Sequence, residues 1–146
     1  MSGAFRFLED VALADSAFEA SGASPSELFE SAARAVIETM VNPDTVAIQW
    51  SRDIDKRETT LEDLLFEWLS IMVYLKDADG VVYYDARAQV SQESGQASWH
   101  LRGRLEGETI DPARHELRAD VKAVTKHLYG VRREHDRWIA RVVLDI

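Results

Sequence analysis

The segment from Leu61 to Lys76 constrains the fold most, because its apolar residues cover nearly the whole circumference of a helix. Thr60 precedes it, and the acidic residue Asp63 follows three positions later, which is the spacing of a helix N-cap. The polar residues of the segment form only a narrow stripe: Asp63, Glu67 and Ser70. A helix that is apolar on almost every side is usually buried. We therefore expect this helix to pack between two layers of structure.

A second helix is predicted to begin at Ser24-Pro25-Ser26-Glu27, where the same capping spacing is combined with proline at the first helical position. Apolar residues then recur at helical spacing: Leu28, Phe29, Ala32, Ala33, Val36, Ile37 and Met40. The residue before a proline avoids helical geometry, so the helix should end before Asn42-Pro43.

Alternating apolar residues predict strands over most of the remaining chain. The predicted strands include residues 46–50, the hairpin partners 82–90 and 97–105, and the hairpin partners 121–131 and 138–146. The pattern is two helices with about seven mostly antiparallel strands. Because the helices need cover on both sides, the sequence predicts an α+β fold, a three-layer β/α/β sandwich that forms a single domain over residues 1–146.

Composition narrows the classes of function. The chain has 146 residues, of which 46% are hydrophobic and 29% charged, as in globular domains. It has no cysteine, which excludes disulfides, thiolate metal sites and cysteine nucleophiles. The net charge of −9 argues against strong binding to nucleic acid or an anionic membrane, since the mean field repels phosphate. No apolar run approaches the length of a membrane span, and Met1–Glu9 lacks the features of a signal peptide, so we expect a cytoplasmic protein.

Positive charge gathers in one place, the predicted C-terminal hairpin. Its basic residues are Lys122, Lys126, Arg132, Arg133, Arg137 and Arg141. Two interpretations stay open: a solvated face of the hairpin, or a surface that binds phosphate.

The last two residues indicate a metal site. The side chain of Asp145 and the terminal carboxylate of Ile146 together offer up to four anionic oxygens, the ligands that calcium and magnesium prefer. A further carboxylate, such as that of Asp15, would complete a shell. The alternative is that Asp145 merely ends a strand.

A parity argument suggests neighbours for Asp145. If the loop of the C-terminal hairpin has an even number of residues, Asp145 shares a face with Asp120, Lys122 and Lys126, because side chains alternate with period two. A loop of odd length or a bulge would break this relation.

The histidines do not indicate catalysis. His115 lies in the charged loop Asp111–Glu116 without an evident partner, and we expect it to be solvated. His127 alternates with Thr125 and Tyr129 and is expected to serve packing. No histidine pair has a zinc-ligand spacing, and the chain has no phosphate-binding loop, dinucleotide fingerprint or serine elbow, so no catalytic residue is assigned.

Several segments resemble the archease family in the order in which they occur. They are Phe7-Leu8-Glu9, Gly22, Leu61–Leu69, Asp111–Leu117, Val121–Thr125 and Val143–Ile146. Each match is short, but the ordered set spans nearly the whole chain. The resemblance implies an archease-like fold, in agreement with the three-layer sandwich.

The N-terminal motif departs from the family. Archeases typically carry the sequence aspartate-histidine-threonine-alanine-aspartate, whereas the segment Glu9–Asp15 is two residues longer and retains only Ala14-Asp15. The resemblance implies that Asp15, Asp145 and Ile146 bind a divalent cation, calcium or magnesium. Further residues with a candidate functional role are Lys122, His115, Asp120 and Asp10.

The resemblance implies an accessory protein and not an enzyme. Archeases assist the RtcB-type RNA ligase in tRNA splicing or RNA repair. This ligase joins an RNA end bearing a 2′,3′-cyclic phosphate or 3′-phosphate to a 5′-hydroxyl end. Archeases promote its guanylylation and its multiple turnover. One alternative is a chaperone or modulator of RNA-processing proteins. Another is a metal-dependent hydrolase. The sequence argues against it, because it shows no nucleophile and no histidine is expected beside Asp145.

Overall fold

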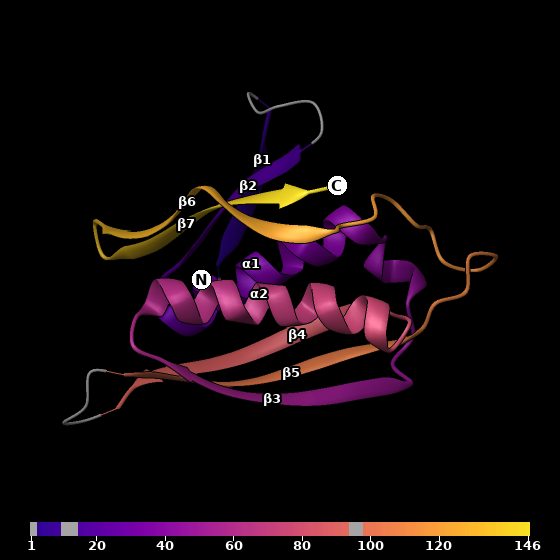
Figure 1. The fold of residues 1–146 in the computed structure, drawn as a ribbon, viewed down its shortest axis with the longest axis horizontal. Coiled ribbons are helices and arrows are strands. Elements are labelled where there is room, and N and C mark those ends of the chain that lie inside the picture. The colour runs from indigo at the N-terminus through magenta and orange to yellow at the C-terminus, as the bar shows by residue number, and fades with distance from the viewer. Residues whose placement is uncertain (1–2, 10–14, 94–97) are drawn as a thin grey trace.

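The computed structural model describes residues 3–9, 15–93 and 98–146. Two α-helices and one short 3-10 helix lie among seven strands in this part of the chain (Figure 1). The helices are α1 (Pro25–Met40), η1 (Pro43–Thr45) and α2 (Leu61–Ala78). The strands are β1 (Ala4–Leu8), β2 (Asp15–Gly22), β3 (Trp50–Glu58), β4 (Val81–Gln92), β5 (Trp99–Thr109), β6 (Ala123–Glu134) and β7 (Arg137–Asp145).

Both helices begin where the sequence predicts. The Ser24 hydroxyl accepts a hydrogen bond from the Glu27 backbone N–H at 3.2 Å, and the Thr60 hydroxyl does the same for Asp63 at 3.1 Å. These bonds satisfy backbone donors that the first turn of a helix leaves without a partner. At its other end, α2 is followed by Gly80 with φ +61°, a left-handed conformation that glycine adopts at low cost.

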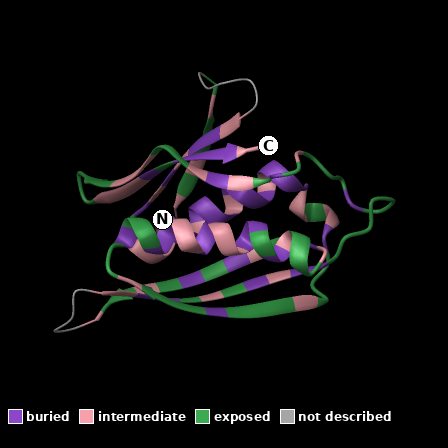
Figure 2. Ribbon diagram, viewed as in Figure 1, coloured by how far each residue is buried: buried purple, intermediate pink, exposed green. Residues whose placement is uncertain are grey.

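The strands form two antiparallel sheets that enclose the helices. One sheet has the order β1-β2-β7-β6 and the other the order β3-β5-β4, and α1 and α2 lie between them (Figure 1). Buried residues line the helix faces that point toward the sheets (Figure 2). This arrangement confirms the predicted three-layer β/α/β sandwich. It also gives the four-stranded sheet one face on the core and one face on solvent.

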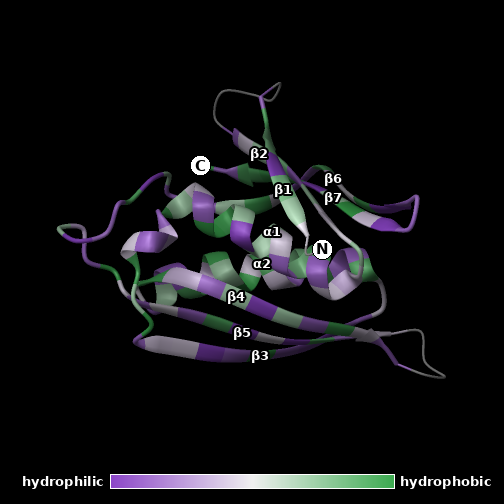
Figure 3. Ribbon diagram, turned by 180° about the vertical axis from the view of Figure 1, so that it is seen from behind, coloured by the Kyte–Doolittle hydropathy of each residue, from purple (hydrophilic) through white to green (hydrophobic). Residues whose placement is uncertain are grey.

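The prediction of a strand at residues 46–50 is wrong. The strand of this region is β3, which begins only at Trp50, and a bend precedes it. Of its nine residues only Ile54 is buried, and most of the others are charged (Figure 3). Its polar composition therefore hides the alternation by which a strand is recognised.

The C-terminal hairpin contains a bulge that the sequence pattern does not predict. Its loop is the two-residue turn His135-Asp136, both with positive φ, as in the type I′ turns that suit hairpins. Further along, the four residues from Lys126 to Tyr129 lie opposite the single residue Val142 of β7. The bulge shifts the register by three residues and so inverts the parity between β6 and β7 near the C-terminus.

Among the described residues, none of the helices combines the length and the hydropathy that a membrane span requires.

Candidate functional site

Two of the predicted metal ligands lie side by side on the solvent face of the four-stranded sheet. The register of β2 and β7 places Asp15 directly opposite Asp145. Both residues are half-buried. Their neighbours one position along, Ser16 and Leu144, are paired on the other face, where Leu144 is in the core. The structure thus brings together two carboxylates that are separated by most of the sequence.

This pair has an electrostatic cost that a cation would relieve. Like charges directly opposite each other on neighbouring strands are destabilising. Among the described residues, neither carboxylate forms a side-chain hydrogen bond or an ion pair within 4.0 Å. Oxygen ligands of this kind suit a hard divalent cation. The donor chemistry of the pair therefore fits calcium or magnesium.

The third predicted ligand, Ile146, directly follows Asp145, and its side chain holds it against the core. Its side chain is partly buried and packs against the core. The Lys122 backbone N–H donates a hydrogen bond to the Asp145 carbonyl at 2.7 Å, which holds the end of β7 against the chain that enters β6. This bond fixes the main chain immediately before Ile146.

The predicted neighbours of Asp145 are wrong. The residue opposite Asp145 on β6 is Ala123, so Ala123 and Thr125, and not the even-numbered residues, share its face. The loop has an even length as the argument required, but the bulge from Lys126 to Tyr129 inverts the parity. The Lys122 side chain is exposed. Lys122 thus meets Asp145 through its backbone.

Asp120 is placed elsewhere. Its carboxylate accepts a hydrogen bond from the Lys76 ammonium group of α2 at 2.6 Å. This bond and the positive charge of Lys76 hold the pKa of Asp120 below its usual value. Asp120 therefore has an ion partner on the helix and does not join the carboxylate pair. Asp10 lies outside the described residues.

His115 is buried, so the prediction of a solvated loop histidine is wrong. Its Nδ1 accepts a hydrogen bond from the Asp111 backbone N–H at 2.9 Å. Its Nε2 therefore carries the ring proton and donates a hydrogen bond to Oε1 of Glu108 at 2.6 Å. Both ring nitrogens are used in holding the loop after β5. This is a structural role, with no nitrogen left for proton transfer.

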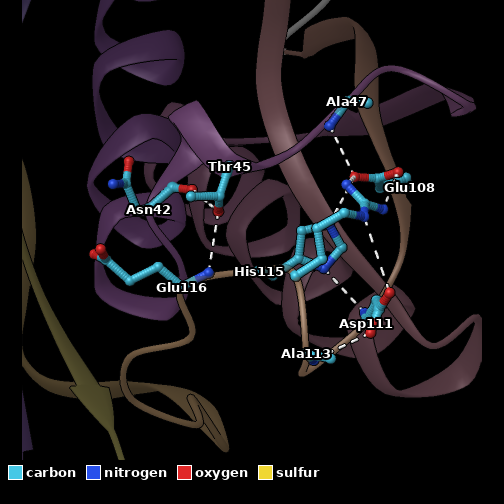
Figure 4. Close-up of polar contacts among 9 residues, drawn as sticks. Asn42, Thr45, Ala47, Glu108, Asp111, Ala113, His115 and Glu116 are labelled. Carbon is cyan, nitrogen blue, oxygen red and sulfur yellow. Dashed lines mark hydrogen bonds and ion pairs between the residues drawn. The ribbon is translucent and has the colours of Figure 1, made fainter.

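Glu108 is the centre of this network and was not predicted from the sequence. Its carboxylate accepts two hydrogen bonds from the Arg114 guanidinium, both at 2.8 Å, and one from the Ala47 backbone N–H at 2.9 Å (Figure 4). Arg114 first, then Ala47 and His115, hold the pKa of the Glu108 carboxyl well below its usual value of 4.5. The sequence signal that could have indicated this role is the short loop after Thr109, which brings Arg114 and His115 back to Glu108 at the end of β5.

Replacing His115 with alanine is expected to destabilise the fold by about 2–3 kcal/mol, because it removes one partner of the Glu108 carboxylate and one of the Asp111 N–H at a buried position. Urea unfolding measures the change. His127→Ala is the matched control. His127 is exposed, so its predicted packing role is wrong, and its removal should change the free energy of unfolding by less than about 0.5 kcal/mol. Equal effects of the two substitutions would contradict the structural role.

Acid is expected to weaken the same network. The pKa of Glu108 is lower in the folded than in the unfolded chain, so its contribution to stability is present above about pH 4.5 and is lost as the pH falls toward the folded value. Thermal melts between about pH 7 and about pH 3 should therefore show a smaller acid-induced decrease in Glu108→Gln than in the wild type. Asp53→Asn, which removes an exposed carboxylate, should retain the wild-type profile. Identical profiles for Glu108→Gln and the wild type would contradict this assignment.

Comparison with known proteins identifies the family. The model of the archease protein family matches residues 5–146. The archease of Pyrococcus furiosus is 35% identical over 134 residues, which cover 91% of this chain and 93% of the relative.

Solved structures agree with this match. Protein 1598 of Methanobacterium thermoautotrophicum superposes with a TM-score of 0.81 at 31% identity, covering 97% of this chain and 98% of that one. A Thermotoga maritima protein, described as an archease and possible chaperone, shares the fold with a TM-score of 0.55 at 22% identity over 97% of this chain and 98% of that one. The family match and the relatives above 30% identity confirm the resemblance read from the sequence: the chain belongs to the archease family.

Proposed function

We propose that this archease activates an RNA ligase of the RtcB type, in tRNA splicing or RNA repair, through a divalent cation held at Asp15 and Asp145. The observation that supports this proposal is the pairing of these two carboxylates across β2 and β7 on the solvent face of the sheet. A surface carboxylate pair that faces solvent can meet the active site of a larger partner.

The pair leaves part of a cation's coordination shell for other ligands. Among the described residues, no group of three or more histidine, cysteine, aspartate and glutamate side chains is placed to hold a metal. Calcium takes six to eight oxygen ligands, and magnesium keeps several waters. Asp15, Asp145 and a main-chain oxygen of Ile146 would therefore supply only part of the shell. The remaining positions would be open to water, to phosphate oxygens or to groups of the ligase.

The sheet gives the two carboxylates a fixed separation. Asp145 ends the strand β7, which is hydrogen-bonded to β2 on one side and to β6 on the other. Side chains on a paired strand are better fixed than those on a loop. A rigid pair of this kind would favour the ligase conformation that accepts the guanylyl group, because a ligand shifts an equilibrium toward the state that it binds more tightly.

Guanylylation of the ligase tests the proposal directly. The ligase of the same organism is incubated with GTP and a divalent cation, with and without this chain, and the covalent ligase–guanylate is followed with time. The proposal predicts faster formation in the presence of the chain. An unchanged rate at every ratio of chain to ligase would contradict it.

A general chaperone is the second candidate, because an apolar cavity of about 230 Å³ lies open between α1, β4 and the segment 110–120. Its lining includes the exposed apolar residues Ile110 and Leu117. A chaperone would suppress the aggregation of unrelated unfolded proteins. We expect no such suppression, and strong suppression together with unchanged guanylylation would favour the chaperone.

A further inference from the structure

The bulge of β6 divides its residues between two directions. Lys126 and Tyr129 contact α2: the Lys126 ammonium group lies 4.1 Å from the centre of the Phe66 ring, and the Tyr129 hydroxyl donates to the Glu62 carbonyl at 2.6 Å. The two residues between them, His127 and Leu128, are exposed. Bulges commonly redirect side chains in this way. The inner residues hold the bulge on the helix, and the outer ones project from it.

Leu128 combines a left-handed backbone conformation, which belongs to the bulge, with an exposed apolar side chain. Its φ is +54°, in the left-handed region that glycine and asparagine adopt readily and leucine rarely does. Its side chain is not covered in return, since Leu128 is 55% exposed. Glycine or asparagine at this position would reduce the backbone strain and remove the exposed apolar surface. Strain that brings no gain in packing is typical of functional positions.

Leu128 stands between two hollows on the solvent face of the four-stranded sheet, and Arg141 lines both with it. One hollow, of about 410 Å³, includes Ala17 and Val143, which are almost completely buried although they belong to the solvent face. The other, of about 340 Å³, extends along β6 past Arg132. An isobutyl group and a guanidinium group therefore form a ridge between two hollows that polar and apolar residues line together.

Arg141 lacks the ion partner that its position would suggest. It lies directly opposite Glu19 in the register of β2 and β7. The Glu19 carboxylate instead pairs with Arg6 at 3.2 Å and with Arg132 at 3.5 Å. Among the described residues, Arg141 forms no ion pair within 4.0 Å. Two arginines thus contact Glu19, and Arg132 also pairs with Glu134 at 3.0 Å.

We propose that Leu128 and Arg141 form the docking anchor of this archease on its RNA ligase, and that they enter an apolar pocket bordered by carboxylates on the ligase. This inference rests on the proposed function, because it takes the ligase as the partner. A strained apolar residue beside an arginine that has no ion partner in the described part of the chain matches the chemistry of interface hot spots. Arg141, which forms no ion pair within 4.0 Å among the described residues, would be complemented by a carboxylate on the partner. Arg141 and Asp145 lie on the same face of β7, four residues or about 13 Å apart, so one partner can contact both.

The test measures two independent properties of Leu128→Asn. Asparagine tolerates positive φ, so its melting temperature should equal or exceed that of the wild type. Its affinity for the ligase, measured by titration calorimetry, should fall about tenfold or more. Arg141→Gln should weaken binding and reduce its dependence on salt. Leu117→Asn is the matched control, since Leu117 is another exposed leucine, at 40%, and lies away from this ridge.

The outcomes separate this inference from the proposed function. If the wild type binds and activates the ligase and Leu128→Asn does so equally well, the docking anchor is wrong and the proposed function stands. If only Leu117→Asn loses binding to the ligase, the ligase docks at the 230 Å³ cavity that Leu117 lines, and the inference is overturned. A clear drop in the melting temperature of Leu128→Asn would show that Leu128 serves folding, and would overturn it as well. If the wild type does not bind the ligase, both proposals fail.

Discussion

Replacing Asp145 with asparagine is expected to weaken calcium or magnesium binding by on the order of 100-fold and to abolish the activation of the ligase. The substitution keeps the shape of the side chain but removes one of the two charges that face each other across β2 and β7. Titration calorimetry measures the affinity, and the guanylylation assay measures the activation.

The same variant should be at least as stable as the wild type when a chelator removes divalent cations. Without a divalent cation, Asp145→Asn should melt at the same temperature as the wild type or higher, because the repulsion between Asp15 and Asp145 is gone. With calcium, only the wild type should gain stability, by mass action. Asp53→Asn removes an exposed acidic residue from the other sheet and should change neither property. Wild-type cation affinity in Asp145→Asn would contradict the assignment of the site.

The second large effect is expected in the core, where replacing Trp68 with alanine should cost about 3–5 kcal/mol of unfolding free energy. Trp68 is completely buried between the two sheets, and its indole N–H donates to the Phe29 carbonyl of α1 at 3.1 Å. The substitution leaves a cavity and removes the hydrogen bond that joins α2 to α1. The melting temperature of proteins of this size falls by about 2–4 °C for each kcal/mol lost, so it should decrease by roughly 10 °C.

Two further variants test how closely Trp68 fits its site. A Cβ at Gly103 would lie 2.6 Å from the Trp68 ring, so Gly103→Ala should also destabilise the protein. Tyr74→Ala changes another aromatic residue of α2, but Tyr74 is 69% exposed and the effect should stay within about 0.5 kcal/mol. A similar loss in Tyr74→Ala and Trp68→Ala would contradict the buried role of Trp68.

The layer architecture could be predicted from the sequence because the helices carry strong local signals. Ser24 and Thr60 mark their first turns, and the apolar circumference of 61–76 requires layers on both sides. The hairpins follow from the alternation in 82–90 and 97–105. By contrast, β3 is an edge strand with polar residues on both faces, so its sequence looks like a loop.

The site could be predicted only in part, for reasons of register and burial. The sequence links Asp145 to Asp15 through the family resemblance, and the structure places the two opposite each other. It cannot reveal the bulge at Lys126–Tyr129, whose residues make long-range contacts with α2, and so the parity argument for Lys122 fails. His115 could not be recognised as buried, because its burial depends on the distant residue Ala47 as well as on Glu108.

Multiple-turnover RNA ligation by the RtcB-type ligase of the same organism, with and without this chain, tests the central claim most directly. The substrate pair is an RNA with a 2′,3′-cyclic phosphate or 3′-phosphate end and an RNA with a 5′-hydroxyl end, both in excess over the ligase. The account predicts many turnovers with the wild-type chain and a return to the level of the ligase alone with Asp145→Asn. An unchanged number of turnovers at every ratio of wild-type chain to ligase would contradict it.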